Sequence, residues 1–104
     1  MISFNGVEWE IYFVSPLHYQ LQKDDGTFAL GVCDDNIKKI YINKDLRRSF
    51  MKKVLAHELA HAAAFSYGMD LSYEEHEMIA DFVSTFGKRI IEETDAIFQN
   101  YKKK

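Results

Sequence analysis

The spacing of apolar residues changes once along this chain, near Lys44, and that change limits the folds it can adopt. Before Lys44, apolar and polar residues alternate with a period of two, as in half-buried β-strands. After Lys44, apolar residues recur every three or four positions, as on one face of an α-helix. Strands followed by helices predict an α+β fold. Because 104 residues is an ordinary domain length, we expect residues 1–104 to form a single domain.

The first part of the chain is expected to form a small antiparallel sheet of three or more strands. Asn5-Gly6 is a typical two-residue hairpin turn, and it joins Ile2–Phe4 to an alternating segment that starts at Val7. Ser15-Pro16 should end that segment. Six aromatic residues are expected to pack between the sheet and the helices, namely Trp9, Phe13, Phe50, Phe65, Phe82 and Phe86.

A second hairpin is predicted from two short strands, Phe28–Val32 and Lys39–Ile42. Cys33 lies at its expected turn, where we interpret it as a small apolar residue rather than a ligand. If this hairpin forms an exposed sheet edge beside the helices, a peptide substrate can add to it as an extra strand.

Two helices are predicted after the sheet. Asp45 is the expected N-cap of the first helix, and Gly68 is its stop signal. Ser72-Tyr73-Glu74-Glu75 fits a capping box and should open a second, long helix. Gly87 is expected to bend or break that helix, and Lys102-Lys103-Lys104 to form a frayed, solvated end.

The composition excludes several classes of function. Thirteen basic and 16 acidic residues give a net charge of −3, so there is no electrostatic case for binding nucleic acid. No apolar stretch is long enough to cross a membrane, and the N-terminus lacks the features of a signal peptide. With Cys33 as the single cysteine, these features favour a cytoplasmic protein. They do not predict an oligomeric state.

One motif on the first predicted helix carries chemistry. His57-Glu58-Leu59-Ala60-His61 has the H-E-x-x-H spacing, which places both imidazoles on one helical face where they can bind one metal ion. Glu58 lies beside the metal's open position and can take a proton from a metal-bound water. The competing interpretation is two partly exposed helix histidines beside a surface glutamate.

A catalytic zinc site needs a third protein ligand. Glu77 and Asp81 lie four residues apart on the second predicted helix, so we favour Glu77 as the ligand and Asp81 as an acceptor that takes the free ring N–H of His57 and orients it. His76 competes as the third ligand. It points about 100° round the helix from Glu77, so normally only one of the two can face the metal.

Together these residues resemble the gluzincin zinc metallopeptidases, and within them the ImmA/IrrE family and its minimal prophage or mobile-element relatives. The resemblance implies a zincin-like fold and peptide-bond hydrolysis with one Zn²⁺ held by His57, His61 and Glu77, with Glu58 as general base. It also implies a protein or peptide substrate, with a cytosolic regulatory protein as the expected target. The chain departs from the pattern in having no recognisable DNA-binding or sensor domain.

Two further points stay open at the level of sequence. An oxyanion donor is expected among Tyr67, Tyr73, His76 and His18, with His76 preferred because it adjoins the ligand. The alternative function is a non-catalytic module, stabilised by zinc, that binds a partner protein or acts as an anti-repressor without cleaving it.

Overall fold

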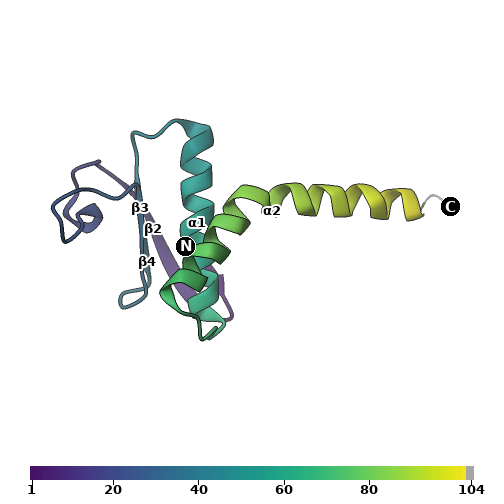
Figure 1. Ribbon diagram of the computed structural model, residues 1–104, viewed down its shortest axis with the longest axis horizontal. Helices are drawn as coiled ribbons and strands as arrows, with labels where there is room; N and C mark the ends of the chain where they lie inside the picture. Colours follow the sequence, from purple (N-terminus) through teal and green to yellow (C-terminus); the bar gives the residue numbers. More distant parts are fainter. Residues whose placement is uncertain (103–104) are drawn as a thin grey trace.

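The computed structural model describes residues 1–102 and has the predicted α+β class (Figure 1). Its elements are β1 (Ile2–Phe4), β2 (Val7–Val14), the short 3₁₀ helix η1 (Tyr19–Leu21), β3 (Gly31–Asp34), β4 (Lys39–Asn43), α1 (Arg48–Ser66) and α2 (Tyr73–Lys102). Helix α1 packs against both the sheet and α2. Of the three C-terminal lysines that were expected to fray, Lys102 is the last residue of α2. Residues 103–104 lie outside the described part of the chain.

The four strands form one mixed sheet in the order β1-β2-β4-β3. The β1/β2 hairpin is confirmed, with Asn5 at φ 51° and Gly6 at φ 77° in its turn. The prediction of a purely antiparallel sheet is wrong, because β2 and β4 pair in parallel. Ile40, Tyr41 and Ile42 are all buried, so β4 takes an interior position in the sheet and leaves β3 at the edge.

The second hairpin is confirmed, although its first strand starts later than predicted. Strand β3 spans Gly31–Asp34 and pairs antiparallel with β4. Phe28 forms only an isolated bridge with Gln22. Cys33 therefore lies within a strand rather than at the turn, and it packs against the core. Burial, followed by the nearby charge of Glu58, raises the pKa of its thiol to about 12, which suits a packing residue.

The core lies between the sheet and α1, where Trp9, Ile40, Ile42 and Ala62 are fully buried. The Trp9 indole N–H donates to Ser66 Oγ at 2.8 Å and so ties β2 to the end of α1. The predicted aromatic core is wrong for the five phenylalanines, which are 38–53% exposed: Phe13, Phe50, Phe65, Phe82 and Phe86. The reason is that α2 packs on α1 instead of on the sheet, so a single helix covers the sheet.

Helix α1 begins three residues after the predicted N-cap. Arg47 occupies the cap position without a side-chain hydrogen bond. Asp45 is not the cap, because its backbone N–H donates to Asn43 Oδ1 at 2.8 Å and this segment forms a turn. The predicted stop is confirmed, since α1 ends just before Gly68, which adopts φ 68°.

Helix α2 opens with the predicted capping box. The Ser72 backbone N–H donates to Glu75 Oε1 at 2.8 Å, and the Glu75 backbone N–H donates to Ser72 Oγ at 3.2 Å. The helix continues through Gly87 without a break, and its second half extends away from α1 (Figure 1). Within residues 1–102, no helix combines the length and the apolar character needed to cross a membrane.

Candidate metal centre

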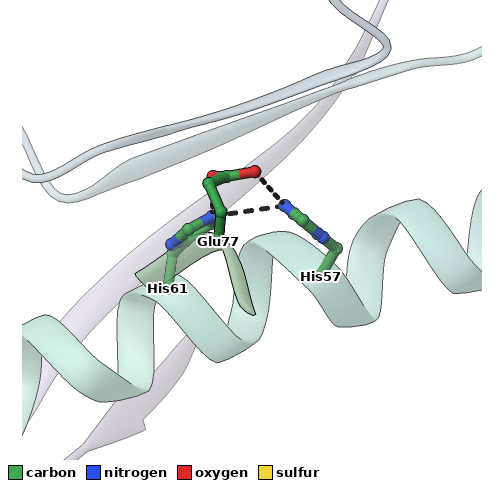
Figure 2. Close-up of side chains that lie close together, drawn as sticks. All are labelled: His57, His61 and Glu77. Atoms are coloured by element: carbon green, nitrogen blue, oxygen red, sulfur yellow. Dashed lines mark hydrogen bonds and ion pairs between the residues drawn. The ribbon is translucent and has the colours of Figure 1, made fainter. Parts of the chain in front are cut away.

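Three side chains converge where α2 crosses α1. His57 and His61, one turn apart on α1, point their Nε2 atoms toward Glu77, which lies in the second turn of α2 (Figure 2). The two Nε2 atoms are 3.2 Å apart. Glu77 Oε1 lies 2.9 Å from His61 Nε2, and Glu77 Oε2 lies 3.5 Å from His57 Nε2.

The spacing and chemistry of these atoms fit a metal ion. Two ligand atoms that each lie about 2.0–2.1 Å from a tetrahedral zinc ion are roughly 3.3 Å apart. The three measured separations, 3.2, 2.9 and 3.5 Å, fall on either side of that value. His57, His61 and Glu77 therefore form a group that could hold a metal ion.

The outward nitrogens of both histidines also have neighbours. His57 Nδ1 lies 3.1 Å from Asp81 Oδ1, which places Asp81 in the position that its spacing from Glu77 predicts. Because a carboxylate only accepts hydrogen bonds, this contact puts the proton on His57 Nδ1 and leaves the Nε2 lone pair toward the centre. His61 Nδ1 faces His76 Nδ1 at 3.5 Å.

His76 lies behind His61 and is not among the three converging residues. Its ring lies between those of His61 and Phe65, with centroid distances of 5.6 and 4.6 Å. Burial lowers the pKa of His61, and the nearby His57 and His76 add to this effect while Glu77 opposes it. The low pKa favours the neutral imidazole that a metal requires.

Glu58 is the buried acidic residue of the site, with 8% of its surface exposed. Burial, followed by the charge of Glu77, raises the pKa of its carboxyl to about 7. Gly31 of β3 lies close to the Glu58 side chain. A Cβ atom at Gly31 would come within 3.1 Å of Glu58 Cγ and 2.9 Å of Val54 Cγ1, so β3 can lie this close to α1 only with glycine here.

Gly31 is a site residue that the sequence did not single out. It lies inside the strand predicted at Phe28–Val32, and a glycine within a strand can mark a close approach of two backbones. That weak signal did not say which element would approach it.

A cleft of about 660 Å³ opens beside the three converging residues. Its walls come from β3, α1 and the start of α2, and they include Cys33, Glu58, Phe65, Tyr73 and His76. A smaller hollow of about 340 Å³ extends past Glu58 to Asp81 and Ser84. Among the expected oxyanion donors, Tyr73 and His76 line the cleft, whereas Tyr67 and His18 do not. His18 instead accepts a hydrogen bond from the Gln20 backbone and caps η1.

The free edge of the sheet borders this cleft. Within residues 1–102, β3 pairs with β4 alone, and the Asn43 N–H donates to the Leu30 carbonyl at 2.9 Å. Hydrogen-bonded and non-hydrogen-bonded pairs alternate along an antiparallel ladder. The backbone N–H and C=O groups of Gly31 and Cys33 therefore point away from β4, toward the open edge.

The chain matches no protein-family model, no curated protein and no solved structure. What the site can do chemically is therefore inferred from its own residues.

Proposed function

We propose that the protein is a zinc metallopeptidase of the gluzincin type, which hydrolyses peptide bonds in a protein substrate. One observation carries the proposal: His57 Nε2, His61 Nε2 and a Glu77 carboxylate oxygen lie at tetrahedral spacing beside the buried Glu58. From the resemblance of its motif, the expected substrate is a regulatory protein of the cytosol.

Zinc is the metal that suits this donor set, because it binds histidine nitrogen and carboxylate oxygen in tetrahedral sites. Three protein ligands leave one position open, which is typical of catalytic rather than structural zinc. When bound, zinc would supply a polarised, acidified water and a Lewis acid for the substrate carbonyl.

Glu58 is the proposed general base. Its carboxylate takes a proton from the attacking water and later delivers it to the leaving amine. The side chain is held in place by close packing under Gly31, which limits the positions that the carboxylate can take. Burial keeps bulk water away from the group and brings its pKa close to neutral, the range in which a base acts efficiently at physiological pH.

The β3 edge is the proposed substrate platform. A peptide in extended conformation can bond to the outward backbone groups of Gly31 and Cys33, and this pairing lays its backbone across the cleft beside Glu58. Backbone pairing is independent of side-chain identity, so sequence preference would come from the walls of the cleft. Tyr73 and His76 are the donors available there for the oxyanion.

Glu58→Gln tests the proposal, because it removes the base but keeps the size of the side chain. We expect zinc content to stay at one ion per chain while cleavage of fluorescein-labelled casein falls by about 10²–10⁴-fold. Glu8→Gln, on the exposed part of β2, is the matched control. Equal cleavage by Glu58→Gln and the wild type would show that Glu58 is not the base.

A non-catalytic zinc module is the second candidate, because the three converging residues come from both α1 and α2 and a metal would hold the two helices together. A purely structural site has no use for a buried carboxylate beside an open cleft. One result distinguishes the two candidates. If wild-type protein that is loaded with zinc cleaves no peptide or protein, the non-catalytic module is favoured.

A further inference from the structure

The second half of α2 presents exposed apolar side chains. Thirty residues of α-helix are about 45 Å long, and α1 runs beside only the first part of this length (Figure 1). Beyond α1, Phe98 is 53% exposed and Tyr101 71%. A surface of this kind is typical of a protein interface.

The exposed residues continue the face of α2 that contacts α1. Positions on this face follow one another at alternating steps of three and four, the spacing of helices that pair lengthwise: Glu77, Ala80, Ser84, Gly87, Ile91, Thr94, Phe98 and Tyr101. The first two lie at the crossing with α1, where Ala80 is fully buried. Ile91 lines a groove beside α1. Thr94, Phe98 and Tyr101 line a separate hollow near the end of α2.

That groove, of about 1030 Å³, lies where α1 and α2 diverge. Its apolar lining includes Ala56, Val83 and Ile91. Its charged side chains are all basic: Arg48, Lys52, Lys53 and Lys88. Within residues 1–102, none of these four forms an ion pair.

The stretch of α2 that follows Ile91 has the complementary charge. Glu92, Glu93 and Asp95 follow one another closely there, among the exposed apolar residues. In the part of the chain that the structure describes, Glu93 is the one of these three with an ion pair, to Arg89 at 3.1 Å on the exposed surface. The chain therefore carries both a basic apolar groove and an acidic apolar helix that would fit a groove of this kind.

We propose that two copies of this chain form an antiparallel dimer, in which the end of each α2 occupies the groove of the other copy. With the two-fold axis near Ile91, the groove-lining stretch 83–91 lies opposite partner residues 99–91. Lys88 then comes level with the acidic stretch of the partner, and each charged contact occurs twice. A second copy fits better than an unrelated protein because this chain itself carries both the basic groove and an acidic, apolar helix segment that complements it.

Charge reversal on full-length protein tests this arrangement. The groove variant is Lys52→Glu/Lys88→Glu, and the helix variant is Glu92→Lys/Asp95→Lys. Each variant alone places like charges opposite each other at both contacts, so we expect its dissociation constant to rise about 100-fold or more. In an equal mixture, both contacts regain opposite charges and the dimer should return.

The measurement is mass by sedimentation equilibrium over a range of concentrations, with helix content checked by circular dichroism. The expected result is a wild-type mass of twice 12.2 kDa, monomeric single variants and a dimeric mixture. The control variant is Asp24→Lys/Asp70→Lys. It changes the net charge by the same amount as the helix variant, but at positions outside both helices, so it should stay dimeric. A monomeric wild type at every concentration, which would leave the groove to another partner, overturns the proposal. So does a mixture of folded variants that stays monomeric.

Discussion

The two halves of α2 share one helical face but differ in what that face meets. The first half crosses α1, where Ala80 is buried and Glu77 converges with two histidines of α1. The second half extends beyond α1 and carries side chains such as Phe98 and Tyr101 that are 53% and 71% exposed. The comparison shows that sequence periodicity predicts which residues share one face of a helix. Whether that face forms part of a metal site or remains an exposed apolar surface depends on whether another helix packs against it.

The sharpest test of this difference replaces the same residue type in each half. Glu77→Ala removes the proposed third zinc ligand, so we expect zinc affinity to fall by more than the roughly 10–100-fold that follows when a residue hydrogen-bonded to a ligand is lost. Glu92→Ala, in the second half, should leave zinc affinity unchanged. Competition with a chelator of known affinity measures both. Retention of zinc by Glu77→Ala together with its loss from His76→Ala would instead identify His76 as the third ligand.

Aspartates give a second matched pair. Asp81→Ala removes the acceptor that holds His57 Nδ1 at 3.1 Å, and zinc affinity should fall by about 10–100-fold. Asp95→Ala should have no effect on zinc affinity, because it lies beyond α1. The same chelator titration applies. If the two variants bind zinc equally well, Asp81 does not orient His57.

Glycines give a pair with opposite expected signs. Gly31→Ala would put a Cβ atom 2.9 Å from Val54 Cγ1 and 3.1 Å from Glu58 Cγ, and we expect it to lower the free energy of unfolding by about 1–3 kcal/mol. Gly87→Ala meets only Val83 Cγ1 at 3.6 Å, and should raise that free energy by about 0.5–1 kcal/mol through helix propensity. Urea unfolding of dilute protein measures both. A Gly31→Ala protein as stable as the wild type would mean that β3 does not constrain Glu58.

The smallest effect concerns the start of α2. Hydrogen bonding to the Ser72 backbone N–H, and then to the Ser72 side chain, lowers the pKa of the Glu75 carboxyl below its ordinary value of 4.5. A lowered folded-state pKa stabilises the protein above the unfolded value, and this contribution is lost as pH falls through the folded value. Between about pH 6 and about pH 3, the wild type should therefore lose more stability than Glu75→Gln. Glu74→Gln, outside the capping box, should follow the wild type.

Two local sequence patterns predicted the local structure correctly. The Asn5-Gly6 turn and the capping box at Ser72 depend on neighbouring residues, and both are confirmed. Strand order was not predicted, because the parallel pairing of β2 with β4 follows from the burial of Ile40 and Ile42 in the folded sheet. The exposure of Phe82 likewise depends on α2 packing against α1 and not on its own sequence.

The candidate site shows the same division. The spacing of His57 and His61 was enough to place both on one face of α1. That Glu77, and not His76, points between them depends on how α2 crosses α1. The closeness of Gly31 to Glu58 joins residues far apart in the chain, and no pattern within either segment encodes it.

Anomalous diffraction at the zinc edge, from crystals of full-length protein grown with zinc, tests the central claim most directly. We expect one peak per chain, bonded to His57 Nε2, His61 Nε2 and a Glu77 oxygen, with a fourth position that no protein atom fills. A peak elsewhere, no peak, or a fourth ligand from the protein would contradict a catalytic zinc centre at the crossing of α1 and α2.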